Sequence, residues 1–241
     1  MTALLAIEDL FAGYVSGVDI LQGLSLKVET GSVTVVIGPN GAGKSTLLRT
    51  LFGLLKPHHG NVRFAGQEIG GREPASIKAL GIGYVPQEIN VFPLLTVEEN
   101  LRMGGWILRR DRAAFARALE RVLDTFPLLA QRRHEPAGAL SGGQGRMLSV
   151  AREMMTAPTL MLVDEPTAGL APALVAQVYE LLQAARKAGS TILLVDQNVE
   201  DALRHADDVY LIDLGRVRAQ GPVREFPLER VSALIKECLL G

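Results

Sequence analysis

The chain has 241 residues, of which 48% are hydrophobic and 21% are charged, and its formal net charge is −1. This composition is typical of a folded globular protein, and the near-neutral charge excludes the basic footprint of a nucleic-acid binder. The single cysteine, Cys238, excludes an intrachain disulfide and favours a reducing compartment.

The N-terminal part of the chain is expected to form an antiparallel β layer. Three of its segments alternate apolar and polar side chains, as strands with one buried face do: residues 6–11, 24–28 and 61–64. Residues 32–37 are mostly apolar and β-branched and predict a strand buried on both faces. A helix is expected from Ser45 to Leu54, ending before Pro57 because proline cannot continue it.

The middle of the chain changes to a helical period. From about Glu88 to Met155 the apolar spacing is mostly helical, with Thr96 as the N-cap of one helix and a second helix over 109–126. This segment is expected to be a helical insertion between strands of the core.

The last third returns to strands and helices. Continuous apolar runs at 159–163 and 191–195 predict buried strands, and the residues between them predict a helix from Pro172 to Lys187. Residues 209–212 and 216–219 predict a hairpin. Strands alternating with helices indicate the α/β class with a mostly parallel sheet.

A single domain over 1–241 is therefore expected, with three parts. The nucleotide-binding α/β core with its β layer comprises residues 1–87 and 156–220. A helical, signature-bearing subdomain comprises residues 88–155, and residues 221–241 form a C-terminal tail helix.

One segment matches the G-x-x-x-x-G-K-[ST] pattern of a phosphate-binding loop, and Thr46 follows it: Gly38, Pro39, Asn40, Gly41, Ala42, Gly43, Lys44 and Ser45. Glycines let the backbone aim successive N–H groups at phosphate oxygens, and the following helix adds its positive end. Lys44 is expected to contact the β- and γ-phosphates, and Ser45 to ligate Mg²⁺. The pattern predicts a nucleoside triphosphate site.

The second half of that site is expected far along the chain, where the apolar run from Leu160 ends in Asp164 and Glu165. Asp164, on a strand beside that of the phosphate loop, is expected to hold Mg²⁺. Glu165 is expected to accept a proton from the attacking water as general base. The long interval from Lys44 to Asp164 is consistent with the inserted helical segment.

Leu140 to Gln144 reads L-S-G-G-Q and, in this order with the other two motifs, resembles the signature of ABC ATPases. Ser141 and the backbone amides of Gly142 and Gly143 form an anion-binding helix N-terminus. The resemblance implies the ABC ATPase fold, and it implies that Ser141 to Gln144 close over the γ-phosphate of ATP held by a facing subunit. The active unit is then a dimer with two composite sites.

The same resemblance assigns two further residues. Tyr14 matches the aromatic residue that stacks on adenine, the alternative being a strand aromatic packed in the core. Gln87, in Tyr84-Val85-Pro86-Gln87, matches the Q-loop glutamine that contacts Mg²⁺ or the attacking water and joins the helical insertion to the core.

The chain departs from the family pattern at two positions. Gln197, in Val195-Asp196-Gln197-Asn198, stands where a switch histidine is usual, and it can donate a hydrogen bond to the γ-phosphate but cannot become a cation. Ala171 replaces the usual aspartate of the loop after Glu165, so it has no polar role. Gln197 is therefore a candidate sensor of the γ-phosphate.

At these two positions, and in the segment from Leu95 to Gly105, the sequence resembles the LivF-type ATPase of branched-chain amino acid importers. A mismatch is Gln87 itself, since members of that family commonly have glutamate there. The resemblance implies ATP and Mg²⁺ as cofactors, permease subunits in the membrane, a second and different ATPase chain, and a periplasmic or extracellular solute-binding protein. Urea or amide importers and the lipopolysaccharide-export ATPase share much of the pattern and remain alternatives.

The expected location of the protein follows from its apolar segments, its N-terminus and the family resemblance. The apolar runs are far shorter than the ~20 residues that span a bilayer, and the N-terminus lacks the basic segment of a signal peptide. We expect a peripheral subunit on the cytoplasmic face of a bacterial-type inner (plasma) membrane, with no transmembrane segment. Two other classes stay open: a soluble ABC ATPase outside transport, and a non-hydrolysing regulatory subunit.

Exposed and buried positions in the insertion are also predicted. Phe92 and Trp106 are expected to pack in the core, the alternative being a surface toward a membrane subunit. Five arginines are expected on an exposed helix face: Arg109, Arg110, Arg112, Arg117 and Arg121.

Overall fold

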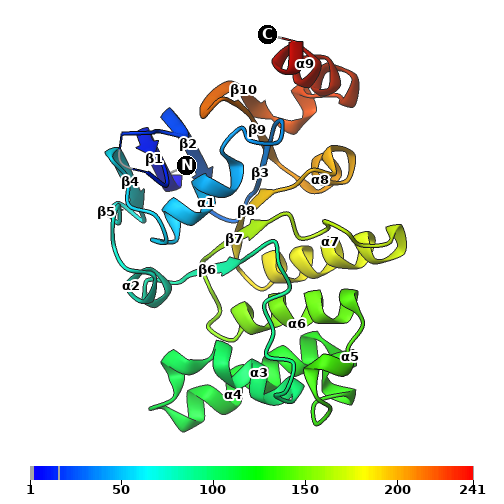
Figure 1. Ribbon diagram of the computed structural model, residues 1–241. Helices are drawn as coiled ribbons and strands as arrows, with labels where there is room; N and C mark the ends of the chain where they lie inside the picture. Colours follow the sequence, from blue (N-terminus) through cyan, green and yellow to red (C-terminus); the bar gives the residue numbers. More distant parts are fainter. Residues whose placement is uncertain (1–2, 16, 241) are drawn as a thin grey trace.

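Two β-sheets lie next to one another at one end of the molecule, and a block of helices forms the other end (Figure 1). The structure is a computed structural model that describes residues 3–15 and 17–240; the other positions of the expected domain lie outside these residues. The smaller sheet has the order β2-β1-β4-β5 with antiparallel pairs. Its strands are β1 (Ala3–Ala12), β2 (Leu21–Glu29), β4 (His59–Phe64) and β5 (Gln67–Glu68). The predicted β layer is confirmed, with longer strands.

The larger sheet has the order β10-β9-β3-β8-β7-β6. Its strands are β3 (Val33–Ile37), β6 (Ile82–Val85), β7 (Leu160–Asp164), β8 (Thr191–Val195), β9 (Asp208–Asp213) and β10 (Arg216–Pro222). Neighbours from β9 to β6 are parallel, and β10 is antiparallel to β9 in the predicted hairpin. The predicted α/β class is confirmed.

One expectation about strand order is wrong. The strand of Asp164, β7, does not lie beside the phosphate-loop strand β3, because β8 pairs with both and separates them. Strand order follows from how the crossover connections pack, and the local residue pattern does not contain it. As a result, the carboxyl ends of β3, β8, β7 and β6 follow one another along a single edge of the sheet.

Both faces of the larger sheet are covered, which explains its continuous apolar runs. On β7, Leu160 and Leu162 belong to the core shared with the smaller sheet, whereas Met161 and Val163 belong to the core shared with the helices. Alternate residues of a strand point to opposite faces, so each apolar run contributes to two cores.

The helical block contains α3 (Val97–Gly104), η1 (Trp106–Leu108), α4 (Arg112–Thr125), α5 (Pro127–Gln131), η2 (Ala137–Ala139) and α6 (Gly142–Met154). Thr96 caps α3 as predicted, in a capping box with Glu99. The second predicted helix begins at Arg112 rather than Arg109, because the Asp111 carboxylate accepts a hydrogen bond from the Ala114 N–H at 2.8 Å and acts as its N-cap.

The remaining helices are α1 (Lys44–Leu51), α2 (Pro74–Ala79), α7 (Pro172–Lys187), α8 (Val199–His205), η3 (Val223–Glu225) and α9 (Leu228–Leu240). The predicted bounds of α7 are confirmed. Helix α1 ends before the expected Leu54, because Gly53 has a φ of +80° that only glycine adopts readily. In the described part of the chain, we find no helix with the length and apolar character that crossing a bilayer requires.

The prediction that Phe92 and Trp106 are core residues is wrong. Their exposed fractions are 42% and 57%. The buried face of α3 is supplied by residues such as Val97 and Leu101. Phe92 lies in the loop before α3, and Trp106 begins η1 after it. The guanidinium groups of Arg152 and Arg109 lie over their rings, at 5.3 and 5.1 Å from the ring centres. The five arginines predicted on an exposed helix face are exposed, but Arg109 and Arg110 lie in the turn before α4 rather than on a helix.

Candidate nucleotide-binding site

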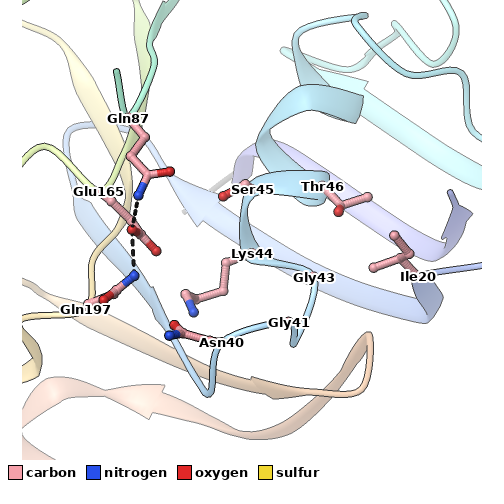
Figure 2. Close-up of a pocket in the computed structure, with 10 residues that line it drawn as sticks. All are labelled: Ile20, Asn40, Gly41, Gly43, Lys44, Ser45, Thr46, Gln87, Glu165 and Gln197. Atoms are coloured by element: carbon pink, nitrogen blue, oxygen red, sulfur yellow. Dashed lines mark hydrogen bonds between the residues drawn. The ribbon is translucent and has the colours of Figure 1, made fainter. Parts of the chain in front are cut away.

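A cleft of about 300 Å³ lies where the strands of the larger sheet end (Figure 2). Its walls come from the loop after β3, from Gln197 after β8, from Glu165 after β7 and from Gln87 after β6. The lining residues are Ile20, Asn40, Gly41, Gly43, Lys44, Ser45, Thr46, Gln87, Glu165 and Gln197. All of these except Ile20 were predicted as site residues. Ligand sites at the carboxyl ends of parallel strands are the general rule for open α/β sheets.

The loop from Gly38 to Gly43 requires glycine for two different reasons. At Gly38, whose φ is +153°, an added Cβ would lie 2.1 Å from the carbonyl oxygen of Ile212. Gly43 has a φ of +102° and immediately precedes the first residue of α1. A side chain would therefore clash at Gly38, and it would strain the backbone at Gly43. With glycine at both positions, the backbone N–H groups before α1 can form a cradle for an anion.

Lys44 is buried, and its ammonium lies within this loop. Nζ donates hydrogen bonds to the carbonyl oxygens of Gly38 and Pro39, both at 2.9 Å. Burial lowers the pKa of Lys44, and the nearby carboxylates of Glu165 and Asp164 oppose the shift. An ammonium has three N–H donors, so Lys44 can bind a phosphate oxygen while it keeps both bonds.

Ser45, which lines the cleft, is hydrogen-bonded to Asp164, which lies outside the lining. The Ser45 hydroxyl donates to Asp164 Oδ1 at 3.0 Å, and the Tyr84 hydroxyl donates to Oδ2 at 3.3 Å. Asp164 is 1% exposed, and this burial raises the pKa of its carboxyl group. Burial also raises the pKa of Tyr84 to about 12. A hydroxyl and a carboxylate in contact are oxygen ligands of the kind that Mg²⁺ binds.

Two amide side chains, which follow different strands of the larger sheet, hold the carboxylate of Glu165. Gln87 Nε2 and Gln197 Nε2 both donate to Glu165 Oε2, each at 2.7 Å (Figure 2). The Glu165 backbone has a φ of +42°, a left-handed conformation that costs a non-glycine residue about 1–2 kcal/mol. Its N–H donates to the Val195 carbonyl oxygen at 2.8 Å, which holds this conformation in place. The carboxylate is thus fixed in position before a substrate arrives.

Asp196 is a residue of this region that the sequence analysis passed over. It is 2% exposed, and its carboxylate accepts hydrogen bonds from the Thr167 hydroxyl at 2.9 Å and the Tyr179 hydroxyl at 3.0 Å. Burial raises the pKa of Asp196. Because Thr167 follows Glu165, this network ties the loop after β7 to the position of Gln197. An acid directly before Gln197 at the end of a buried strand could have drawn attention to it.

Tyr14 lies outside the cleft lining, in the segment after β1. It is 51% exposed, so it is not a packed core aromatic, and its hydroxyl accepts a hydrogen bond from Arg49 Nη1 at 3.2 Å. Its stacking on adenine stays a prediction. Pro39 and Ala42 belong to the phosphate loop without lining the cleft.

The signature residues are also placed away from the cleft, at the start of α6. The Ser141 hydroxyl accepts from the Gln144 N–H, and Gln144 Oε1 accepts from the Ser141 N–H, which gives a capping box. Gly142 and Gly143 form the first turn of the helix. Within one chain these residues do not meet the phosphate loop, so their expected role on a facing subunit stays a prediction.

The fold and motifs agree with comparisons to known proteins. A profile of the ABC transporter family matches residues 21–168. The chain therefore belongs to the ABC transporter family, and it is an ATP-binding, ATP-hydrolysing subunit of that family. A solved ATP-binding cassette of an ABC transporter in its ADP conformation superimposes with a TM-score of 0.86 at 28% identity, covering 100% of both chains.

Two relatives are particularly similar in sequence. The high-affinity branched-chain amino acid transport ATP-binding protein BraG of Pseudomonas aeruginosa is 40% identical over 209 residues, covering 87% of this chain and 89% of that protein. The probable branched-chain amino acid transport ATP-binding protein LivF of Archaeoglobus fulgidus is 40% identical over 215 residues, covering 89% and 90%.

Proposed function

We propose that this chain hydrolyses ATP to energise the import of branched-chain, hydrophobic amino acids through separate membrane subunits. The observation that carries the catalytic part is the pair of amides on Glu165, which fixes a carboxylate at the edge of the phosphate cleft. The similarity to BraG and LivF supports the amino acid assignment.

ATP binds with its phosphates on the loop from Gly38 to Ser45. The backbone N–H groups and the start of α1 bind the phosphate oxygens, and Lys44 adds a positive charge beside them. Ser45 and Asp164 would hold Mg²⁺, which supplies charge neutralisation at the β- and γ-phosphates. Tyr14 stacks on the adenine ring. Most of the catalysis in phosphoryl transfer comes from such positioning and charge stabilisation.

Glu165 accepts the proton of the attacking water on its carboxylate. Gln87 and Gln197 hold that carboxylate, and an amide keeps the same charge and donors across the physiological pH range, unlike histidine. Gln197 also donates to the γ-phosphate and senses it. Because Glu165 is present and oriented, the non-hydrolysing regulatory alternative is the weaker one.

The working unit is a dimer in which Ser141 to Gln144 of each subunit close over ATP bound by the other. The second ATPase is a different chain, and both sit beneath two permease subunits at the cytoplasmic face of the inner (plasma) membrane. A periplasmic or extracellular solute-binding protein delivers the amino acid. Closure of the dimer moves the membrane subunits through the segment that begins at Gln87.

The test is purification of the tagged full chain from membranes in mild detergent, followed by reconstitution into vesicles. We expect permease subunits and a second ATPase to accompany the chain, and ATP to drive uptake of leucine, isoleucine or valine. Glu165→Gln is the matched control, since it should recover the same complex without uptake.

Two outcomes contradict the proposal. Uptake of urea or amides without amino acids, or export of lipopolysaccharide, would move the chain to one of the related transport systems. Recovery of the chain with no membrane protein would favour a soluble ABC ATPase that acts outside transport.

A further inference from the structure

Arg146 is a buried charge that the proposed mechanism does not use. It lies on α6, two residues after Gln144 of the signature, and only 2% of it is exposed. A buried guanidinium is costly unless its donors are bound, so its partners indicate its purpose.

Those partners are two consecutive backbone carbonyls of the segment after β6. Arg146 Nη1 donates to the Pro86 carbonyl oxygen at 2.7 Å, and Nη2 donates to the Gln87 carbonyl oxygen. The planar guanidinium presents its donors in a fixed fork, so bonds to two adjacent carbonyls fix both the place and the direction of the backbone.

The backbone fixed in this way carries a side chain of the site. Gln87 Nε2 donates to Glu165 Oε2 at 2.7 Å. Burial lowers the pKa of Arg146, and the charges of the Asp164 and Asp196 carboxylates oppose this shift. Arg146 is therefore close enough to interact electrostatically with two acids of the site region. A continuous chain of contacts therefore runs from α6 through Arg146 and Gln87 to the carboxylate of Glu165.

We propose that Arg146 is a positioning residue, which fixes the backbone of Gln87 to the signature helix so that the Gln87 amide stays on Glu165. This inference rests on the proposed function, in which Glu165 is the general base. Because Ser141 caps α6, a shift of the signature toward the facing subunit's ATP is passed to Glu165 of its own chain through this arginine. The same fork thereby links the two composite sites of the dimer.

The chain offers a matched control on the same helix. Arg152 also lies on α6 and also donates to a backbone carbonyl of the same segment, that of Asn90. Asn90 comes three residues after Gln87 and does not line the cleft. Loss of either guanidinium removes one anchor of the segment, but only loss of Arg146 releases Gln87.

The experiment compares Arg146→Gln and Arg146→Lys with Arg152→Gln in the assembled complex, with turnover expressed per ATP-binding site. Displacing an oriented group by about 1 Å can cost up to about 100-fold, so we expect Arg146→Gln to lower kcat about 10- to 100-fold. The KM for ATP should stay within about twofold, because Arg146 does not line the cleft. Arg152→Gln should leave kcat within about twofold.

A double-variant cycle separates positioning from a general structural role. If Arg146 acts through Gln87, kcat of Gln87→Ala with Arg146→Gln should match that of Gln87→Ala alone within about twofold. Arg146→Lys keeps the charge but lacks the rigid planar fork, so it should hold the two carbonyls less firmly and retain an intermediate kcat. It stands in if Arg146→Gln does not fold.

Full kcat in folded Arg146→Gln, or in Arg146→Lys where Arg146→Gln does not fold, would overturn the inference, as would multiplied losses in the double variant. These failures differ from a failure of the proposed function. If Gln87→Ala and Glu165→Gln both turn over ATP like the wild type, the assignment of Glu165 as base is wrong, whatever the Arg146 variants do.

Discussion

The cleft and the helical block are built in different ways. At the cleft, polar groups satisfy one another: Lys44 on backbone carbonyls, Ser45 on Asp164, and two amides on Glu165. In the helical block and the loop that leads into it, large apolar side chains are instead exposed, namely Ile89, Phe92, Leu94, Met103, Trp106 and Ile107. A pre-organised polar cleft suits a small charged substrate, whereas an exposed apolar surface suits a protein partner. The difference indicates that substrate and partner bind in separate regions.

The largest effect is expected at the phosphate loop. Lys44→Ala removes the positive charge beside the phosphates, and we expect ATP affinity to fall at least about 100-fold, since charge-assisted bonds to phosphate are among the strongest. Lys56→Ala is the control, because it removes an exposed lysine from the loop after α1. Equilibrium binding of a fluorescent ATP analogue measures the effect, and equal affinity in the two variants would contradict it.

A substitution at the exposed apolar side chains of the helical region should weaken association with the permease subunits and leave ATP binding unchanged. Leu94 is 93% exposed, so Leu94→Glu should change the free energy of unfolding by less than about 0.5 kcal/mol. Because the variant places a charge in the exposed apolar surface, we expect recovery of the permease subunits to drop about tenfold or more. ATP binding by the chain alone should be unchanged.

Leu54→Glu provides the control for that prediction, since Leu54 is also exposed but follows α1, outside the helical block. Equal loss of permease with both variants would show that the apolar surface of the helical block has no special role. Quantitative mass spectrometry of the purified complex measures the recovery.

A smaller effect concerns stability. The pKa of Asp164 is raised above its ordinary 3.8, so the ionised carboxylate destabilises the fold, and this cost grows as pH rises through and above that value. Asp164→Asn should therefore raise the free energy of unfolding by about 1 kcal/mol near pH 7 without nucleotide, and the gain should vanish in acid. The Ser45 and Tyr84 hydroxyls can rotate to suit the amide.

Denaturant unfolding between pH 4 and 8 checks this, together with the stabilisation by ATP and Mg²⁺. The variant should lose most of that ligand-induced stabilisation, although it is more stable than the wild type without ligand. A variant less stable than the wild type at neutral pH would contradict the raised pKa as the cause.

The features predicted from sequence are those that depend on neighbours along the chain. The phosphate loop, the Thr96 cap and the bounds of α7 follow from residue types at fixed short spacings. Placing β8 between β3 and β7 needs the packing of the whole sheet, which no local pattern contains.

The same limit applies inside the site. Gln87 and Gln197 were predicted individually, but their meeting on one oxygen of Glu165 joins residues 78 and 32 positions apart. Nothing in the local sequence marks Arg146 as buried, since burial of its guanidinium depends on where α6 packs. Phe92 and Trp106 were misplaced because an aromatic side chain fits a core and an interface equally well.

The central claim is that Glu165 is the base that hydrolyses ATP bound to the Gly38–Ser45 loop. The most direct measurement is phosphate release in a single turnover by the assembled complex, compared between the wild type and Glu165→Gln, with bound ATP determined in parallel. We predict that the variant binds ATP as the wild type does and releases phosphate at least about 100-fold more slowly, because its amide cannot accept the proton. Release at the wild-type rate with normal ATP binding would contradict the claim.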